Sequence, residues 1–130
     1  MFMRPAVSEH IHIAVDTKYI GKQRKHADQE VFVFSYTVSI TNLSDKPVTL
    51  RNRYWLITNG NGEKVEVSGE GVVGEQPTIA PMKTFQYTSA SMLKTEVGSM
   101  QGHYEFEQHD HSMCKAQIPV FRLAVPNALH

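Results

Sequence analysis

The sequence predicts an all-β fold, an immunoglobulin-like or fibronectin type III-like antiparallel sandwich of about seven to eight strands. Three observations support this prediction. Apolar and polar residues alternate with period two over most of the chain. Clusters of turn-forming residues separate the alternating segments at short intervals. Outside one turn at 91–93, no stretch repeats apolar residues at helical spacing, which favours a sandwich over a parallel sheet covered by helices.

The first two predicted strands show the alternation most clearly. Ile11, Ile13 and Val15 are apolar and their neighbours are mostly polar, so this segment has one buried face. Within 31–41 the apolar face lies at even positions, and serines and threonines occupy the odd positions from residue 35 onward. The connection between the strands carries a basic stretch and a glycine, and it is expected to be a solvated, flexible loop. Its basic residues are Lys18, Lys22, Arg24, Lys25 and His26.

Residues 48–59 predict the third strand, although its apolar positions change phase along the way. They are even before residue 52 and odd after it, where Trp55 lies. A bulge near Asn52 would reconcile the two halves, because one extra residue reverses the facing of every later side chain. Asn-Gly-Asn-Gly at 59–62 then predicts a tight hairpin leading into a fourth strand at 64–67.

The later strands follow a loop rich in glycine and proline at 69–81. Alternation predicts strands near 84–88, 100–107 and 115–125. Pro119 places the last of these at a sheet edge, because proline has no backbone N–H to give to a central ladder.

Two aromatic residues favour the immunoglobulin-like form of the sandwich. Trp55 lies in the third strand, and Tyr104 comes two residues before Phe106 late in the chain. In that fold a tyrosine at the corresponding place hydrogen-bonds back to a corner of the sandwich, and a tryptophan packs in the core. The sequence therefore predicts these two roles.

Length and charge limit the function classes. The 130 residues suit a single domain spanning 1–130, and 13 basic side chains balance 13 acidic ones. A neutral chain has no overall field that attracts nucleic acid or an anionic membrane, so neither partner is expected. No apolar run approaches the roughly 20 residues of a membrane span, and the first residues do not read as a signal peptide. With a single cysteine, the expected compartment is the cytoplasm.

No residue pattern indicates catalysis. Cys114 has no orienting partner that the sequence reveals, and Ser89 and Ser91 fit no nucleophile motif. The carboxylates are scattered, without a pair whose spacing suggests acid–base work. We therefore predict that the chain is not an enzyme.

The glycine loop spells G-x-G-x-x-G at Gly69, Gly71 and Gly74. A dinucleotide-binding domain requires a helix after this motif, and Pro77 and Pro81 come too soon for one. Two interpretations stay open. The loop's backbone N–H groups hold an anion, or the glycines simply supply positive φ in a long crossover between the sheets.

Two local groups of histidines are candidates for metal ligands. His10 and His12 share one face of the first strand, and His109 and His111 flank Asp110 in a turn. Such pairs can each give two ligands to a divalent cation, and imidazole suits Co²⁺, Ni²⁺ or Zn²⁺ better than Mg²⁺. The alternative is that all four are ordinary exposed histidines. One site using both pairs is not expected, since the two groups belong to opposite outer faces of a sandwich.

From about Val7 to its end, the sequence resembles the bacterial ApaG family. The glycine loop at 69–77, Phe85–Ser89 and the ending at 118–126 carry this resemblance. Further matching positions are Leu93, Thr95, Gly98, Met100, Gly102 and Tyr104. At Met82 and Ala90 the family usually has glycine, so the two local turns are expected to differ in geometry.

The resemblance implies a sandwich domain without an established enzymatic activity or cofactor. In bacteria the family is associated with cobalt and magnesium resistance or efflux. In eukaryotes a similar domain occurs in an F-box protein and in a polymerase-delta-interacting protein, where it resembles an interaction module. Because the chain shows no membrane span, a connection with efflux would be indirect.

Together these observations predict a non-catalytic binding module whose partner is a protein not yet identified. The expected contact surface is the glycine loop with the strand after it: Gly69, Gly71, Gly74, Pro77, Tyr87, Thr88 and Ser89. The alternative is a small-ligand binder for a phosphate-containing nucleotide or a divalent cation. Exposed sheet edges would also allow self-association, for which a symmetric dimer is the default form.

Overall fold

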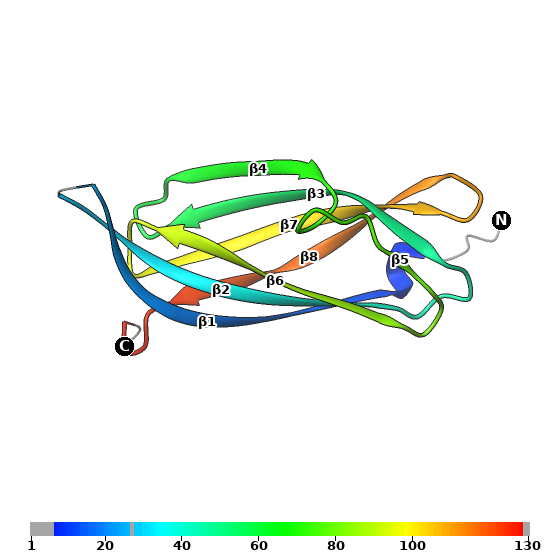
Figure 1. Ribbon diagram of the computed structural model, residues 1–130, viewed down its shortest axis with the longest axis horizontal. Helices are drawn as coiled ribbons and strands as arrows, with labels where there is room; N and C mark the ends of the chain where they lie inside the picture. Colours follow the sequence, from blue (N-terminus) through cyan, green and yellow to red (C-terminus); the bar gives the residue numbers. More distant parts are fainter. Residues whose placement is uncertain (1–6, 27, 129–130) are drawn as a thin grey trace.

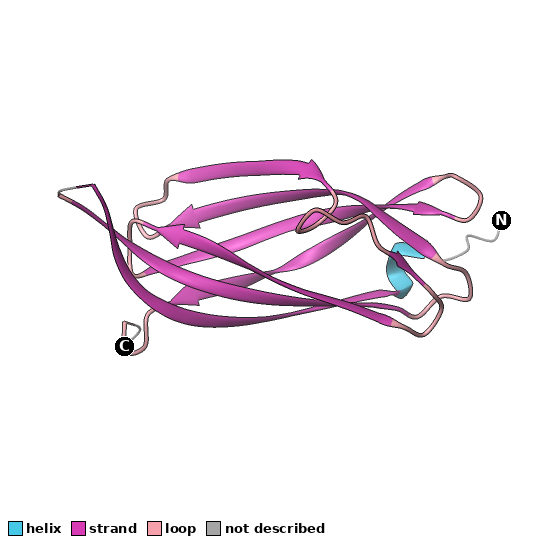
Figure 2. Cartoon of the chain, viewed as in Figure 1, coloured by secondary structure: helices cyan, strands magenta, loops and turns pink. Residues whose placement is uncertain are grey.

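Two antiparallel sheets face one another in the computed structural model, which describes residues 7–26 and 28–128 (Figures 1 and 2). The first sheet has the order β1-β2-β6, and the second has the order β4-β3-β7-β8 with β5 paired to β3. The elements are η1 (Val7–His10), β1 (Ile11–His26), β2 (Gln29–Asn42), β3 (Val48–Asn59), β4 (Lys64–Glu70), β5 (Thr78–Ile79), β6 (Thr84–Leu93), β7 (Val97–Gln108) and β8 (Met113–Ala124). The prediction of a β-sandwich is confirmed.

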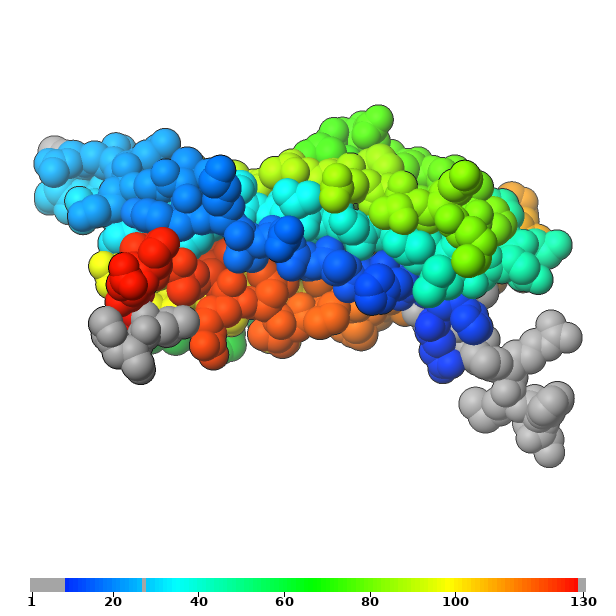
Figure 3. All heavy atoms as spheres, turned by 90° about the horizontal axis from the view of Figure 1, so that it is seen from below, coloured from blue at the N-terminus to red at the C-terminus, as the bar shows by residue number. Residues whose placement is uncertain are grey.

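The hairpin of β1 and β2 corrects one prediction. The basic stretch is not a flexible loop, because β1 continues through it to His26 and pairs with β2 as far as Gln29. Gly21 stands at a bulge with φ of 151°, where the register shifts between Tyr19 and Gly21. The long basic side chains lie exposed on this edge strand, so a strand accommodates them as easily as a loop would. In Figure 3 this end of the hairpin projects beyond the rest of the molecule.

The predicted bulge in the third strand is present. The register between β3 and β7 shifts between Leu50 and Asn52. Leu50 before the bulge and Trp55 after it are both buried, so the shift keeps the apolar residues on the core side. The hairpin that follows β3 closes with a hydrogen bond from the N–H of Gly62 to the C=O of Asn59 at 3.0 Å, as the glycine-rich turn predicted.

The centre of the core is aromatic and corrects the role predicted for Tyr104. Trp55 and Tyr104 meet edge to face with ring centroids 6.2 Å apart, which places both in the core. The Tyr104 hydroxyl does not reach a corner of the fold. It lies mid-strand in β7 and shares a hydrogen bond with the hydroxyl of Tyr87 on the opposite sheet. Burial raises the pKa of both tyrosines, so both hydroxyls keep their protons and tie the two sheets together.

The end of β6 corrects a second local prediction. Residues 91–93 do not form a helical turn, because β6 pairs with β2 up to the pair of Leu93 and Phe32. Ser91 and Leu93 are buried and Met92 between them is exposed, which is the period of a strand. The prediction for β8 is confirmed, since this strand lies at the edge of its sheet and contains Pro119.

The described residues include no helix with the length and apolar character needed to cross a bilayer.

Candidate functional site

The glycine loop folds into a hairpin of its own between β4 and β5. Val72 and Glu75 exchange both of their backbone hydrogen bonds, at 2.8 and 2.9 Å. Val73 and Gly74 form the tip, with φ of 42° and 80°. A two-residue turn with positive φ at both central positions is the type I′ turn, whose preferred sequence is Asn-Gly. The loop is therefore a closed turn, not an open cradle.

Gly71 and Val72 fix this hairpin to the body of the sandwich. The N–H of Gly71 donates to the C=O of Arg51 at 2.7 Å, and a Cβ on Gly71 would lie only 2.2 Å from the Glu75 carbonyl oxygen. The side chain of Val72 is fully buried in the core. Of the two interpretations of the motif, positive φ is observed at Gly71 and Gly74.

The side chain of Arg53 hydrogen-bonds to the base of the hairpin, and this residue was not among those predicted from the sequence to form the site. Its Nη1 donates to the carbonyl oxygens of Glu70 at 3.0 Å and Gly71 at 2.9 Å. Because Arg53 precedes the buried Trp55 by two positions in β3, its side chain faces the same side of the sheet. That shared parity with Trp55 was the signal available in the sequence, since the apolar positions of this strand are odd after residue 52.

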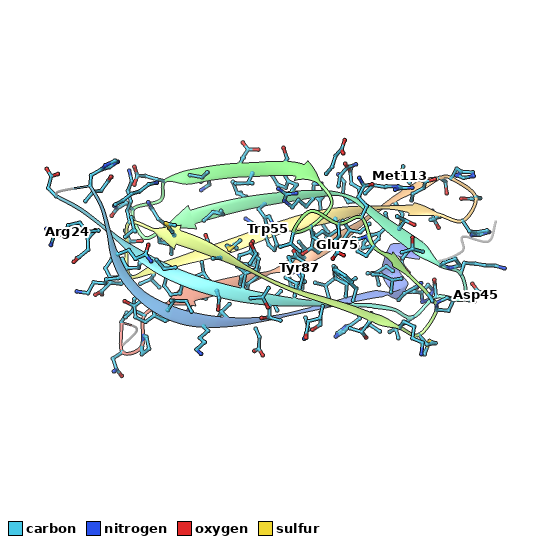
Figure 4. All side chains as sticks on the ribbon, viewed as in Figure 1. Arg24, Asp45, Trp55, Glu75, Tyr87 and Met113 are labelled. Atoms are coloured by element: carbon cyan, nitrogen blue, oxygen red, sulfur yellow. The ribbon has the colours of Figure 1, made fainter. Side chains whose placement is uncertain are left out.

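A cavity of about 200 Å³ lies between the hairpin and the inner faces of β2, β3 and β6. Its walls are formed by Tyr36, Arg53, Trp55, Val72, Val73, Gly74, Tyr87 and Ser89. Figure 4 shows Trp55, Tyr87 and Glu75 of the hairpin gathered in this part of the molecule. The site thus combines segments that are far apart in the sequence.

The structure brings together only some of the predicted contact residues. Gly74, Tyr87 and Ser89 line the cavity. Thr88 points to the outer face, where its hydroxyl pairs with that of Thr37 at 2.8 Å. Two others lie apart from the cavity wall: Gly69, which packs against the Arg53 guanidinium, and Pro77, whose C=O accepts from the N–H of Leu50.

Chemically, this site offers contact and hydrogen bonding. Aromatic rings supply apolar surface, protonated tyrosine hydroxyls donate or accept, and the Arg53 charge is held beside them. Among the described residues, no buried side-chain nitrogen or oxygen lacks a hydrogen-bond partner. The arrangement therefore suits docking of a partly apolar group with a hydrogen-bonding function.

The four candidate metal ligands are all exposed. His10 and His12 lie on η1 and β1, whereas His109 and His111 lie in the turn between β7 and β8. Nδ1 of His111 is 2.7 Å from Oε2 of Glu107. Over residues 7–26 and 28–128, no group of three or more histidine, cysteine, aspartate or glutamate side chains is placed to hold a metal. Each histidine pair remains a prediction of two ligands at most.

We expect replacement of Arg53 by methionine to loosen the hairpin. The variant loses two charge-assisted hydrogen bonds to the Glu70 and Gly71 carbonyls, so stability should fall by about 1–3 kcal/mol. Amide hydrogen exchange at Val72 and Glu75 should accelerate in the same variant. Arg51→Met is the control, since the partners of Arg51 are the side chains of Glu107 and Gln76 and not the hairpin backbone, and this variant should lose less stability. Equal losses in the two variants would contradict the role given to Arg53.

His103 predicts a weak pH dependence of stability. Partial burial, helped by Lys115, lowers its pKa, and its ring stacks on Tyr54 at 5.0 Å. Protonation is thus harder in the folded state, so stability should decline as pH falls through the unfolded value of about 6.5. The decline should be shallower in His103→Gln than in the parent when urea midpoints are compared between pH 7.5 and 5.5. A His103→Gln slope equal to the parent's would refute the assignment.

Comparison with known proteins gives consistent matches along the chain. The sequence model of a family described as ApaG domain matches residues 22–108. A relative named Protein ApaG from Enterobacter sp. (strain 638) is 54% identical over 123 residues, covering 95% of this chain and 98% of the relative. Protein ApaG from Escherichia coli (strain K12 / DH10B) is 52% identical with the same coverage.

Two solved structures are similar in fold and sequence. The X-ray structure of Northeast Structural Genomics Consortium target SoR45 has a TM-score of 0.92 and 42% identity, covering 96% of this chain and 94% of that one. A crystal structure from Bordetella pertussis has a TM-score of 0.81 and 35% identity, covering 91% of this chain and 95% of that one.

Proposed function

The chain belongs to the ApaG family, and from that premise we propose that it is a non-catalytic binding module whose ligand is another protein. The proposed contact surface is the tip of the hairpin at 72–75 together with the cavity beside it. The metal resistance or efflux associated with the family would then depend on this protein contact, in the cytoplasm, and not on ion binding by the chain itself. The strand order β1-β2-β6 against β4-β3-β7-β8 supports the finer immunoglobulin-like or fibronectin type III-like assignment.

The observation that carries this proposal is the residue at the hairpin tip. Val73 has φ of 42° and its side chain is 57% exposed. A β-branched residue in this backbone region is an outlier that costs about 1–3 kcal/mol, and asparagine is the usual residue there. A strained apolar side chain that gains nothing from burial in the free protein is typical of a contact residue.

The alternative small ligand has weaker support. The N–H groups of Gly71, Val72 and Glu75 already donate to backbone carbonyls, so the hairpin has few amides left for a phosphate. Calorimetry with ATP, pyrophosphate, Co²⁺ and Mg²⁺ at millimolar concentration tests this alternative directly. Heat of binding that disappears in Val73→Asn would favour the small ligand over the protein.

A Val73→Asn variant tests the proposal and should have two opposite effects. Relief of the backbone strain should raise the free energy of unfolding by about 1 kcal/mol in urea denaturation. Loss of the apolar tip should at the same time remove the protein partner that co-purifies with the tagged chain from its own cells. A stabilised variant with weaker binding separates contact from folding.

Met82→Asn provides a matched control. Met82 also has positive φ, 64°, and its side chain is 68% exposed, but it lies in the turn before β6, away from the cavity wall. This variant should gain similar stability and retain the partner. If Val73→Asn kept every partner that the parent chain captures, the hairpin tip would not be the contact surface.

A further inference from the structure

The inner face of β4 is uncovered. Val65 and Val67 pair with Ile57 and Trp55 in the β3–β4 ladder, and cross-strand partners share one face of a sheet. The valines therefore point to the core side, yet they are 58% and 39% exposed. The cause is the unequal width of the sheets. The first sheet ends at β6, while β4 extends the second sheet beyond β3 on the same side of the molecule (Figure 1).

The free edge of β6 exposes a row of unpaired backbone groups. The N–H of Asn42 in β2 donates to the C=O of Lys83 at 3.0 Å, and its C=O accepts from the N–H of Met82 at 2.6 Å. In an antiparallel pair, the N–H and C=O groups of successive residues point alternately toward and away from the neighbouring strand. The even positions of β2 therefore bond to β6, where their partners are the odd positions. The even positions 84–92 of β6 consequently turn their N–H and C=O groups outward. This edge can accept another strand.

A cavity of about 370 Å³ lies at the far end of this uncovered strip. Ile57, Val65 and Leu93 give it an apolar lining, and the half-exposed Met92 borders it. Three lysines stand in its lining against one carboxylate, Glu63: Lys25, Lys64 and Lys94. An apolar cavity with excess positive charge is complementary to an apolar chain that carries an acidic residue.

We propose that an extended segment of the partner protein pairs with the free edge of β6 and becomes the fourth strand of the first sheet. Its inward side chains cover Val65 and Val67, and an acidic residue of the segment meets the lysines around Lys94. This inference rests on the proposed function and defines its partner as an acidic, alternating apolar segment. The small side chains of Ser89 and Ser91 face inward on β6 and leave room for the incoming residues.

The probe is a dye-labelled peptide of two aspartates followed by seven alternating valine and threonine residues, because a segment antiparallel to β6 places its first residues beside Leu93 and Lys94. Its matched control begins with two lysines. With the full chain, fluorescence anisotropy should show at least about tenfold tighter binding of the aspartate peptide. Amide hydrogen exchange followed by NMR should slow at Gln86, Thr88, Ala90 and Met92, and should not change along the free edges of β1 and β8.

Two variants separate strand pairing from charge. Ala90→Pro removes one outward N–H without touching the β2 ladder and should abolish peptide binding. Thr17→Pro is the matched control on the free edge of β1. The N–H of Leu43 donates to the C=O of His10, so even positions of β1 face β2 and odd positions such as Thr17 face outward. This variant should bind the peptide normally. Lys64→Glu with Lys94→Glu replaces exposed residues and should reverse the preference between the two peptides, even if Ala90→Pro fails to fold.

Several outcomes would overturn the inference. These are equal affinity for both peptides, protection at β1 or β8, unchanged binding by Ala90→Pro, or sedimentation showing a dimer of the chain that Ala90→Pro converts to a monomer. Each leaves the proposed function standing if Val73→Asn still loses its partner. If all these variants kept both the peptide and every protein partner, the proposed function and the inference about the β6 edge would both be wrong.

Discussion

Replacing Asn42 with leucine is expected to destabilise the protein by about 3 kcal/mol, because a fully buried amide would be lost. Nδ2 of Asn42 donates to the carbonyl oxygens of Lys46 at 2.8 Å and Ile79 at 2.9 Å. Its Oδ1 accepts from the N–H and the hydroxyl of Ser44, at 2.9 and 2.6 Å. Leucine fills a similar volume but leaves the buried Ile79 carbonyl without this donor away from water, whereas the Ser44 hydroxyl and the Lys46 carbonyl still bond to each other at 2.9 Å.

Loss of the Asn42 hydrogen bonds is also expected to displace the hairpin tip. Asn42 joins the end of β2 to Ile79 of β5, and β5 is the segment that leads the chain from the hairpin to β6. We therefore expect Asn42→Leu to weaken partner binding as well, through displacement of the hairpin.

The variant Asn59→Leu serves as a control that separates the effect of burial from the effect of the number of hydrogen bonds lost. Asn59 makes hydrogen bonds to Asn61 and Glu63 within the turn after β3, but these bonds are exposed and water can replace them. Asn59→Leu should lose no more than about 1 kcal/mol in the same urea denaturation experiment. Equal losses at the two positions would mean that burial is not the dominant cause.

The sandwich itself was predictable because its signal is local. One face of each strand must be apolar, so Ile11, Val38 and Trp55 reveal their orientation within a few residues of sequence. The bulge at Asn52 was predictable for the same reason, since it reverses that local pattern. The errors came where the local pattern was weak. In 18–26 an edge strand exposes both faces, so alternation disappears although the strand continues.

The site was only partly predictable because its contacts cross between the sheets. The glycine motif located a loop, but not that this loop closes into a hairpin with Val73 at a strained tip and Val72 buried. Arg53 reads as an ordinary polar strand residue until its two carbonyl partners on β4 and the hairpin are known. The hydrogen bond between Tyr87 and Tyr104 joins residues on opposite sheets. Such pairings depend on how the sheets stack, which a single sequence does not specify by spacing.

Gly102→Ala is expected to destabilise the fold by about 3 kcal/mol, through overpacking alone. A Cβ at this position would lie 1.9 Å from the carbonyl oxygen of Tyr54, a backbone atom that cannot move without separating β3 from β7. Gly102 also pairs with Trp55, so the displacement would disturb the aromatic core below the cavity.

The comparison with Gly62→Ala shows why the close approach decides the outcome. Gly62 has positive φ, 82°, but its added Cβ would meet no atom within 4 Å, so the loss should be only about 1 kcal/mol from backbone strain. Urea denaturation of both variants measures the difference, and near-ultraviolet circular dichroism should report an altered tryptophan environment in Gly102→Ala alone. A Gly102→Ala protein as stable as the parent would show that β3 and β7 can separate locally. The position of Trp55 in the cavity wall would then be adjustable, and a partner could reshape the cavity on binding instead of meeting a preformed one.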